Sequence, residues 1–594
     1  MIKQSYQLVL HLQGPILSQA SGTLVFGVDA AMQSYREKPV LNGTQIRGNL
    51  RHVLLYFKNK LPESEHKTRL INYLKNWFPD EPQNKEDNTP NYDTHRSTLD
   101  FDLFWHTQCA IKSTEKTRTR IQIDADKGKV KEGALQVVED LFPSGSRVAF
   151  SGRIHARFFS KDEQHQFEAW MAKALQWLGA VGSLKGVGYG RLLDHELRSV
   201  TQSSSPNPIM LPDNDTRFGI RLHLDRPFCI GRQRSKEDNR IVSHTDIPGQ
   251  IIKGVIAQQI KERDEINDPN ALSTLLDETF AFNDLTFTHA KPVEKPSLSR
   301  PQAIPLNLAK TDKQWQQYTT EDPLNMNWHE MPSFQPDWKA QDWDNAEKFM
   351  KSPSTKPDRY LLVRTAIEPG KNAAKKHALF SLECVDNHGF DWCADVDLSK
   401  IAPEMRPKVI DNLQTLMNDG LHGIGKTRAR ATISITSPFS SLAPLDEKAT
   451  QWQITLQTAT RMLPFEIQVP GINGQDKLRE YYEKYWHEAS DGELTLLNYF
   501  AQQEMVGNDY FHHHFRKANN KSYAPEWLTT AGSVFILQSK PDSEGKKARE
   551  KLNEWQQSNL PAWESDSDEA HWKSTVHIPQ HGYGEITVKA IKTR

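Results

Sequence analysis

The sequence predicts an α+β protein made of tandem ferredoxin-like domains, each with the element order strand, helix, strand, strand, helix, strand (βαββαβ). Three observations lead to this prediction. A helix, a glycine-rich basic loop and a strand follow one another twice, and two further blocks recur in the same order. The chain has 594 residues, too many for one hydrophobic core, so about three to five domains are expected.

The first recurring feature is the helix–loop–strand segment. In the first copy, apolar residues at helical spacing lead into the loop LGAVGSLKGVGYGR at 178–191, and a strand-like segment follows. In the second copy, helical spacing covers 403–420, the loop GLHGIGKT covers 420–427, and a Thr- and Ile-rich strand is expected at 428–438. A third glycine-rich loop, at 580–584, also leads into a strand-like segment. The repetition indicates copies of one domain.

Two further blocks align between the copies without a gap. Residues 39–57 align with 246–260, and residues 133–145 align with 377–389. In the first of these blocks, the matched positions are Gly43, Ile46, Arg47 and Gly48 with Gly249, Ile252, Lys253 and Gly254. Three matched blocks in one order therefore indicate a duplicated domain.

These blocks and the polar linkers between them predict the domain boundaries. We expect a first domain at 1–200 with a protruding hairpin (a thumb) near 112–133, a linker at 201–216, a second domain at 217–440 with a long insertion at 291–358, and a third unit at 445–594. The third unit contains no clear turn-and-helix block, so its fold is the least specified. The insertion is long for a connection inside a domain and is interpreted as a functional or partner-binding arm.

Composition excludes several classes of protein. The net charge is −1, so no global positive field attracts nucleic acid, although a local basic groove remains possible. Four cysteines indicate a reducing compartment, and no segment has the length and apolarity of a membrane span. A cytoplasmic protein without membrane partners is expected. Neither His106 with Cys109 nor the set Cys384, His388 and Cys393 has the paired spacing of a zinc site, so no metal centre is predicted from them.

The loop GLHGIGKT also fits the phosphate-loop pattern GxxxxGK[ST] of nucleotide-binding proteins. That loop requires a strand before it and a helix after it, so that the helix N-terminus faces the phosphates. Here the predicted order is reversed, and no nucleotide cofactor is expected. Nucleotide binding through Lys426 stays an alternative.

At this point the residues resemble a known family. The blocks NGTQIRGNLR and IPGQIIKGV resemble the IPGSSxKGxxR block of RAMP proteins, the RNA-binding subunits of CRISPR effector complexes, and the glycine-rich loops resemble that family's C-terminal loop. Residues 117–150 are similar to the arm-and-strand region of backbone subunits of type III effectors. The resemblance implies an antiviral backbone subunit that binds guide RNA (crRNA), with complementary target RNA and other effector subunits as partners. It also implies that the charged arm is a thumb that kinks the guide–target duplex.

On this interpretation, main-chain N–H groups, lysines and arginines meet the RNA phosphates, and glycines let the main chain approach them. The predicted RNA-binding residues are Arg47, Arg51, Arg118, Arg120, Lys185, Gly186, Gly188, Gly190, Arg191, Lys253, Gly425, Lys426 and Arg428. Ordinary turns with solvated basic side chains are the alternative for each loop taken singly.

The resemblance further implies a catalytic residue. Asp29 lies between the first strand and the NGTQIRG turn, where type III backbone subunits carry an Asp that supports cleavage of target RNA. Such cleavage needs a carboxylate that holds a divalent ion, Mg²⁺, near the scissile phosphate. Asp238 is a weaker candidate in the second copy. Two alternatives stay open: a purely structural subunit, and a guide-processing endoribonuclease that uses a histidine of the run His512–His514.

Overall fold

The computed structural model forms two compact units. It describes residues 2–20, 27–79, 96–109, 117–124, 126–200, 216–234, 239–266, 268–297, 299–311, 314–319, 333–352, 356–367, 374–439, 444–464, 474–507, 525–540, 545–563 and 575–591. Unit 1 comprises Met1–Pro206 with Arg234–Ile241 and Leu361–Glu383, and unit 2 comprises the remainder.

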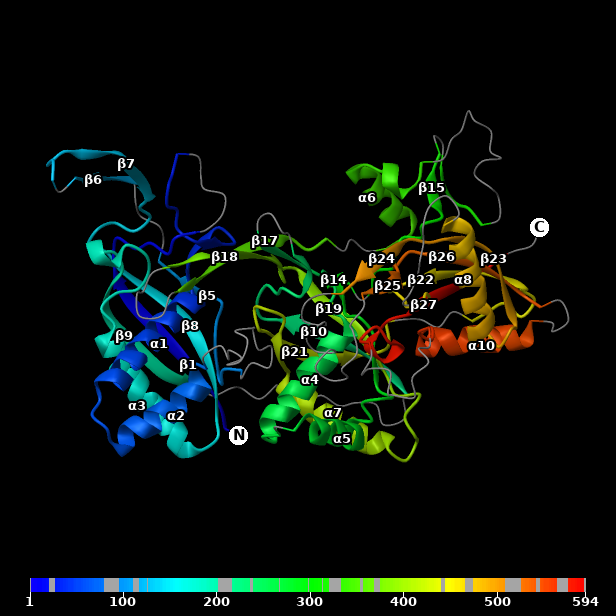
Figure 1. The fold of residues 1–594 in the computed structure, drawn as a ribbon, viewed down its shortest axis with the longest axis horizontal. Coiled ribbons are helices and arrows are strands. Elements are labelled where there is room, and N and C mark those ends of the chain that lie inside the picture. Colours follow the sequence, from blue (N-terminus) through cyan, green and yellow to red (C-terminus); the bar gives the residue numbers. More distant parts are fainter. Residues whose placement is uncertain are drawn as a thin grey trace. The chain divides into compact units, whose positions relative to one another are not determined.

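Unit 1 contains a seven-stranded sheet in which β2 (Ser34–Tyr35), β3 (Lys38–Asn42), β5 (Phe104–Thr107), β8 (Arg147–Phe158), β1 (Ile2–Gln13) and β9 (Arg191–Val200) follow in this order, while β4 (Leu99–Phe101) pairs with β8. Strand β1 pairs antiparallel with β8 on one side and β9 on the other. Its alternate residues Tyr6, Leu8, Leu10 and Leu12 are buried. They form one core with the apolar stripes of α1 (Gly43–Lys60), α2 (Glu65–Trp77) and α3 (Lys161–Trp177). These three helices are shown with the sheet in Figure 1.

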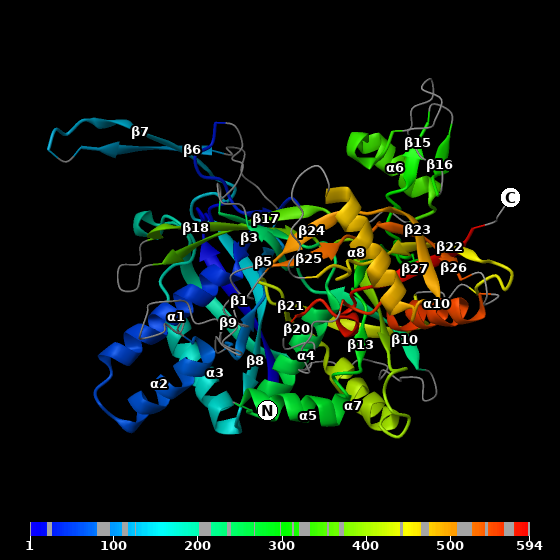
Figure 2. The ribbon, with the colours of Figure 1, turned by 45° about the vertical axis from the view of Figure 1, so that its right-hand side comes forward.

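The charged arm of unit 1 is an antiparallel hairpin of β6 (Thr117–Ile123) and β7 (Val130–Glu139), and both ribbon views show it projecting from its domain (Figures 1 and 2). Its second strand ends at Glu139, beyond the expected end at 133, and residues 112–116 of the expected range lie outside the described residues. Four of its apolar side chains are largely exposed: Ile121, Ile123, Val130 and Leu135.

The second domain, in unit 2, has a sheet in the order β13 (Thr286–Phe287), β19 (Phe390–Asp397), β10 (Arg217–Leu224), β21 (Ala429–Thr436) and β20 (Leu421–Ile424), with β14 (Lys291–Glu294) also on β19. Its core includes apolar residues of α4 (Gly249–Arg263), α5 (Pro269–Phe280) and α7 (Arg406–Asp419). The strands β11 (Gly231–Arg234), β12 (Arg240–Ser243), β18 (Ala374–Val385) and β17 (Arg359–Ile367) form a separate four-stranded sheet in this order.

The third domain, also in unit 2, has a sheet in the order β23 (Leu494–Phe500), β26 (Val534–Ser539), β22 (Gln451–Leu456) and β27 (Ile586–Ala590). Its core contains buried side chains of α8 (Gly474–Ala489) and α10 (Lys546–Ser558). A two-stranded sheet of β24 (Gln503–Val506) and β25 (Glu526–Thr529) accompanies them. Helix α8 was not expected, because the third unit was predicted to contain no clear turn-and-helix block.

All three main sheets follow one strand order. The order β9–β1–β8–β5 in unit 1 corresponds to β21–β10–β19–β13 in the second domain and to β27–β22–β26–β23 in the third. The predicted α+β class, with antiparallel sheets, is confirmed. Among the described residues, no helix is long and apolar enough to cross a membrane.

The insertion after β14 lies on the third domain. Strands β15 (Leu308–Lys310) and β16 (Trp315–Gln317) and helix α6 (Ala340–Phe349) form a small apolar cluster. Asn307 donates a hydrogen bond of 3.1 Å to Gln453 on β22, and the main-chain N–H of Leu306 donates one of 2.8 Å to the carbonyl of Gly532.

Candidate nucleic-acid interface

The glycine-rich loop of unit 1 is held by main-chain hydrogen bonds. The N–H of Val181 donates to Gly190 (2.9 Å), the N–H of Gly190 donates to Pro15 (2.8 Å), and the N–H of Ser183 donates to Leu17 (2.6 Å). The loop is therefore anchored on the segment that follows β1.

Two of its glycines are required by this packing. A Cβ on Gly190 would lie 1.9 Å from the carbonyl oxygen of Val181, and a Cβ on Gly182 would lie 2.5 Å from that of Leu17. Gly188 has a φ of +92°, a conformation that side chains disfavour. Gly186 differs from all three, because its φ lies outside the positive range and nothing lies within 4 Å of its Cβ position. The fold itself does not require a glycine there.

Helix α1 carries a second glycine of this kind. Gly48 is exposed inside the helix, and nothing lies within 4 Å of its Cβ position. Glycine inside a helix costs about 1 kcal/mol relative to alanine. Lys185 Nζ donates to Asn49 Oδ1 at 2.9 Å, so the loop meets α1 at the residue next to Gly48. We call Gly48, Gly186 and the main chain beside them the open glycine surface.

A pocket of about 730 Å³ lies at the same junction of α1, α3 and the loop. It is lined by Asn49, His52, Val53, Tyr56, Trp177, Leu178, Gly179, Ala180, Lys185, Gly188, Tyr189 and Arg191. The predicted residues Lys185, Gly188 and Arg191 thus share one cavity, and desolvation there lowers the pKa of Lys185. The aromatic pair Tyr56 and Trp177 was not identified from the sequence.

The other basic residues predicted in unit 1 are half-buried. Arg47 on α1 lies with its guanidinium carbon 5.3 Å from the ring centroid of Phe78, a cation–π distance. Arg51 lies one turn further along α1. Arg118, on β6, forms an ion pair of 2.7 Å with Asp140, so its charge is already compensated; Arg120 lies further along the same strand.

Asp29 lies at the foot of the hairpin. Its Oδ2 accepts a hydrogen bond of 2.6 Å from the N–H of Val137 on β7, and its own N–H donates to the Val137 carbonyl at 2.8 Å. The residue is exposed. Over the part of the chain that the structure describes, no group of three acidic, histidine or cysteine side chains is arranged to hold a metal. Mg²⁺ fits a single carboxylate when substrate phosphates and water complete its shell, so the donor set of Asp29 is compatible with it.

The corresponding block in the second domain is closed. Lys253, aligned with Arg47, is buried, and its ammonium donates to the carbonyls of Phe282 (2.6 Å) and Leu285 (2.9 Å). Burial lowers its pKa to about 7. This placement differs from the predicted phosphate contact, because both the side chain and its donors are used inside the protein.

The segment GLHGIGKT follows α7 and precedes β21, so the predicted helix-to-strand order is confirmed, but its residues Leu421–Ile424 are strand β20, which pairs with β21, rather than loop. A Cβ on Gly425 would lie 2.5 Å from the Cys229 carbonyl, which accepts the N–H of Lys426 at 2.7 Å. The Lys426 side chain is exposed, and Arg428 adopts a φ of +54° in the turn. Asp238 and the histidines at 512–514 lie outside the described residues.

The third glycine-rich loop closes the N-terminus of α4. A Cβ on Gly249, the first residue of α4, would lie 2.5 Å from the His581 carbonyl, and a Cβ on Gly582 would lie 2.7 Å from Cδ2 of His289. Tyr583 is buried. The loop that resembles an RNA-contacting segment therefore contacts protein. The N-terminus of α1 is packed as closely, since a Cβ on Gly43 would lie 1.8 Å from the Asp102 carbonyl oxygen, and Gly254 on α4, like Gly48 on α1, has nothing within 4 Å of its Cβ position. The two blocks therefore differ in which segment covers the helix N-terminus and in the burial of Lys253.

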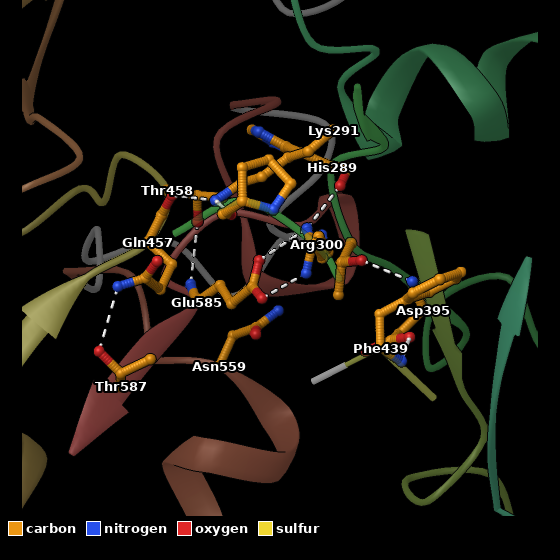
Figure 3. A network of polar contacts seen from close by, with 12 residues as sticks. His289, Lys291, Arg300, Asp395, Phe439, Gln457, Thr458, Asn559, Glu585 and Thr587 are labelled. Atoms are coloured by element: carbon orange, nitrogen blue, oxygen red, sulfur yellow. Dashed lines mark hydrogen bonds and ion pairs between the residues drawn. The ribbon is translucent and has the colours of Figure 1, made fainter. Parts of the chain in front are cut away.

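A buried ionic network continues from this loop (Figure 3). Both carboxylate oxygens of Glu585 accept bonds from Arg300, which also donates to the His289 carbonyl. Lys291 donates to the Gln457 carbonyl at 3.0 Å. Burial opposes ionisation of Glu585, but the charges of Arg300 and Lys291 outweigh it and lower its pKa to about 2. We call this network, which joins the second and third domains, the ionic seam.

Comparison with known proteins agrees with the resemblance. Residues 25–193 match the family model of the RAMP superfamily. No curated protein matches the chain. A chain in the cryo-EM structure of the Type III-B Cmr-beta bound to cognate target RNA and AMPPnP (state 1) is similar with a TM-score of 0.30 and 10% identity, over 54% of this chain and 86% of that one.

A chain in the cryo-EM structure of the Type III-B Cmr-beta bound to cognate target RNA is similar with a TM-score of 0.23 and 12% identity, over 34% of this chain and 97% of that one. Both scores are too low to support an argument about function. The family match covers residues 25–193, which include the hairpin, the glycine-rich loop and the sheet strands β2 to β5 and β8, whereas β1 and most of β9 lie outside it. This first domain belongs to the RAMP superfamily.

Proposed function

We propose that the chain is a guide-RNA-binding backbone subunit of a type III-like CRISPR effector complex. The observation that carries the proposal is the open glycine surface on the RAMP domain. Gly48 and Gly186 are glycines that neither backbone conformation nor packing requires. A ligand that must approach the main chain closely gives a reason for both.

The chemistry of this surface suits a phosphate backbone. Helix α1 has no acidic residue in its first turn, and its N-cap residue Asn42 makes no side-chain capping bond. The Gly43 N–H donates to the Leu103 carbonyl at 2.8 Å, but neither an acidic side chain in the first turn nor a capping side chain offsets the positive dipole end of the helix, which favours an anion nearby. Lys185 and Arg191 supply charge without reading sequence.

The proposal extends to the rest of the chain. The common strand order of the three sheets supports tandem ferredoxin-like, RAMP-like domains. Because the α4 block is closed by the third domain, we assign the principal guide contact to unit 1. The second and third domains would then serve contacts with other effector subunits or with RNA elsewhere.

Target-RNA cleavage at Asp29 is the second part of the proposal. Its exposure and its position at the foot of the hairpin support it. Asp29 would hold Mg²⁺ together with phosphate oxygens of the RNA, and the ion would stabilise charge at the scissile phosphate. A subunit that binds guide RNA and cuts nothing is the competing function.

The test uses the chain co-expressed with a repeat–spacer array and the neighbouring effector subunits. We expect guide RNA to co-purify with the wild-type chain. The amount of bound RNA should fall with Lys185→Ala, which removes a charge beside the open glycine surface, and with Gly186→Val, which blocks that surface. Gly254→Val, on the closed α4 block, is the matched control and should leave the RNA content unchanged. Recovery of a complex without guide RNA would contradict the proposal.

The same complex tests cleavage. With Mg²⁺ and labelled complementary RNA, Asp29→Ala should abolish a cut while guide RNA stays bound. An unchanged cutting pattern would remove Asp29 from the reaction.

A further inference from the structure

Two aromatic side chains that line the pocket of unit 1 are exposed. Trp177, the last residue of α3, is 60% exposed, and Tyr56, on α1, is 41% exposed. Their rings stack with centroids 5.8 Å apart and planes 22° apart. Phe57 also meets the indole, edge-on, with ring centroids 5.9 Å apart and planes at 68°. Because Trp177 is still 60% exposed, its ring remains accessible to a planar group that stacks on it.

The rest of the lining combines apolar residues, Val53, Leu178 and Ala180, with polar and basic ones. Lys185, Arg191 and His52 line the pocket, and none of the lining residues is acidic. Two buried polar atoms of lining residues, Nδ2 of Asn49 and Oη of Tyr189, have no hydrogen-bond partner among the described residues. Buried polar groups are ordinarily paired, so this wall lacks partners that a ligand with acceptor atoms would supply.

We propose that this pocket binds one unpaired nucleotide, with its base stacked on Trp177 and its phosphate at Lys185 and Arg191. The volume of about 730 Å³ is within the usual range for small-molecule sites. Stacking needs no particular base, because every base has a planar face, so the site would accept a nucleotide of any sequence.

The position of the pocket favours a nucleotide of a bound RNA strand as the source. Lys185 belongs both to the pocket and to the contact between the loop and α1 that adjoins the open glycine surface. A strand whose phosphates meet that surface can turn one base into the pocket. In this form the inference rests on the proposed function and adds a base-binding position to it.

The experiment measures binding of the full-length chain at low salt by fluorescence anisotropy. The probes are a single-stranded uridine oligonucleotide, an abasic strand of equal length, and free uridine monophosphate as a competitor. The variants are Trp177→Leu, which removes the ring, and Trp177→Phe, which keeps a smaller one. Phe159→Leu is the matched control, since Phe159 is 43% exposed in the same unit but does not line the pocket.

We expect Trp177→Leu to weaken binding of the uridine strand by about 5- to 100-fold, the range for loss of one stacked base. The variant Trp177→Phe should lose less affinity for the uridine strand, and Phe159→Leu should lose none. The affinity for the abasic strand should be the same for all variants. Because Trp177 is exposed, folding should be intact; Tyr56→Leu is a second variant that removes the supporting ring. Effective competition by the monophosphate would identify a free nucleotide as the ligand source.

Two other outcomes separate this proposal from the proposed function. If Trp177→Leu binds the uridine strand like wild type while Lys185→Ala weakens it, the pocket proposal is overturned and RNA binding stands. If the wild-type chain binds none of the strands, both are overturned. A Trp177 effect that is equal on the uridine and abasic strands would exclude stacking and leave a protein partner as the occupant of the pocket.

Discussion

Removing one charge of the ionic seam should destabilise unit 2 strongly. Glu585 and Arg300 are paired through both carboxylate oxygens, and their side chains are only 9% and 5% exposed. In the variant Glu585→Gln the volume is nearly unchanged, but Arg300 and Lys291 lose the carboxylate that compensates them. Breaking a buried ion pair from one side costs about 3–5 kcal/mol.

This magnitude can be measured by calorimetry. The entropy of unfolding is about 2.1 cal/mol/K per residue, so for a unit the size of unit 2 the loss corresponds to a fall of roughly 5 °C in its melting midpoint. The double variant Glu585→Leu with Arg300→Met should recover most of the loss, because two apolar side chains leave no unpaired charge at this position. The control is Asp344→Asn, which breaks a solvated pair with Lys356 and should leave the midpoint unchanged.

A Glu585→Gln variant that melts with wild type would refute the reasoning. It would mean that water or rearranged side chains compensate Arg300, and that the seam does not behave as a dry ion pair. A double variant as unstable as the single variant would instead point to lost shape complementarity as the cause.

Three further predictions follow from the same structure. The variant Gly48→Ala should raise the stability of unit 1 by up to about 1 kcal/mol and weaken the binding of guide RNA. The variant Gly254→Ala should stabilise α4 without changing RNA binding. Equal effects of the two variants on RNA binding would contradict the contrast between the two blocks. Unit 2 should lose stability as the pH falls below about 6.5, because three of its histidines, His244, His289 and His581, protonate in the unfolded chain but stay neutral when folded. Desolvation lowers their pKa values to about 4, 3 and 3 for His244, His289 and His581. The contribution of each histidine to the stability of unit 2 is complete above the unfolded pKa of about 6.5, and it falls by about 1.4 kcal/mol per pH unit below that value. Chemical denaturation between pH 7.5 and 5 measures this loss. A stability that does not change with pH would show that the histidines protonate inside the folded protein. Finally, Asp29→Asn keeps the acceptor for the Val137 N–H, so it should preserve the melting midpoint of unit 1 while abolishing any Mg²⁺-dependent cut, and a fall in the midpoint would assign Asp29 a structural role.

Elements with aliphatic periodicity could be predicted from the sequence. Helix α7 and strand β21 lie within three residues of the positions that their apolar and β-branched patterns indicate. Helix α8 was not predicted because its buried face is made of Tyr482, Tyr485 and Trp486 among many charged residues, which gives no aliphatic stripe, even though the sequence PGING at 470–474 indicates a turn at its start.

The site could be predicted only in part. The sequence identified the loop at 178–191, but it could not separate Gly190, which packing requires, from Gly186, which packing does not. Because the two blocks align, the sequence also predicted the same role, a contact with RNA phosphate, for Arg47 and Lys253. Their environments differ because the turn after α5 covers Lys253, whose ammonium donates to the carbonyls of Phe282 and Leu285, whereas Arg47 lies against Phe78. Such tertiary contacts leave no local pattern in the sequence.

The ionic seam has a consequence for how similar domains on one chain choose their neighbours. Three sheets with one strand order present related surfaces, and a chain that carries them could dock the wrong pair while it folds. Only the correct pairing brings the carboxylate of Glu585 to Arg300; any other would leave a charge buried alone or force the surfaces apart. The seam thereby selects the second domain as the partner of the third within unit 2.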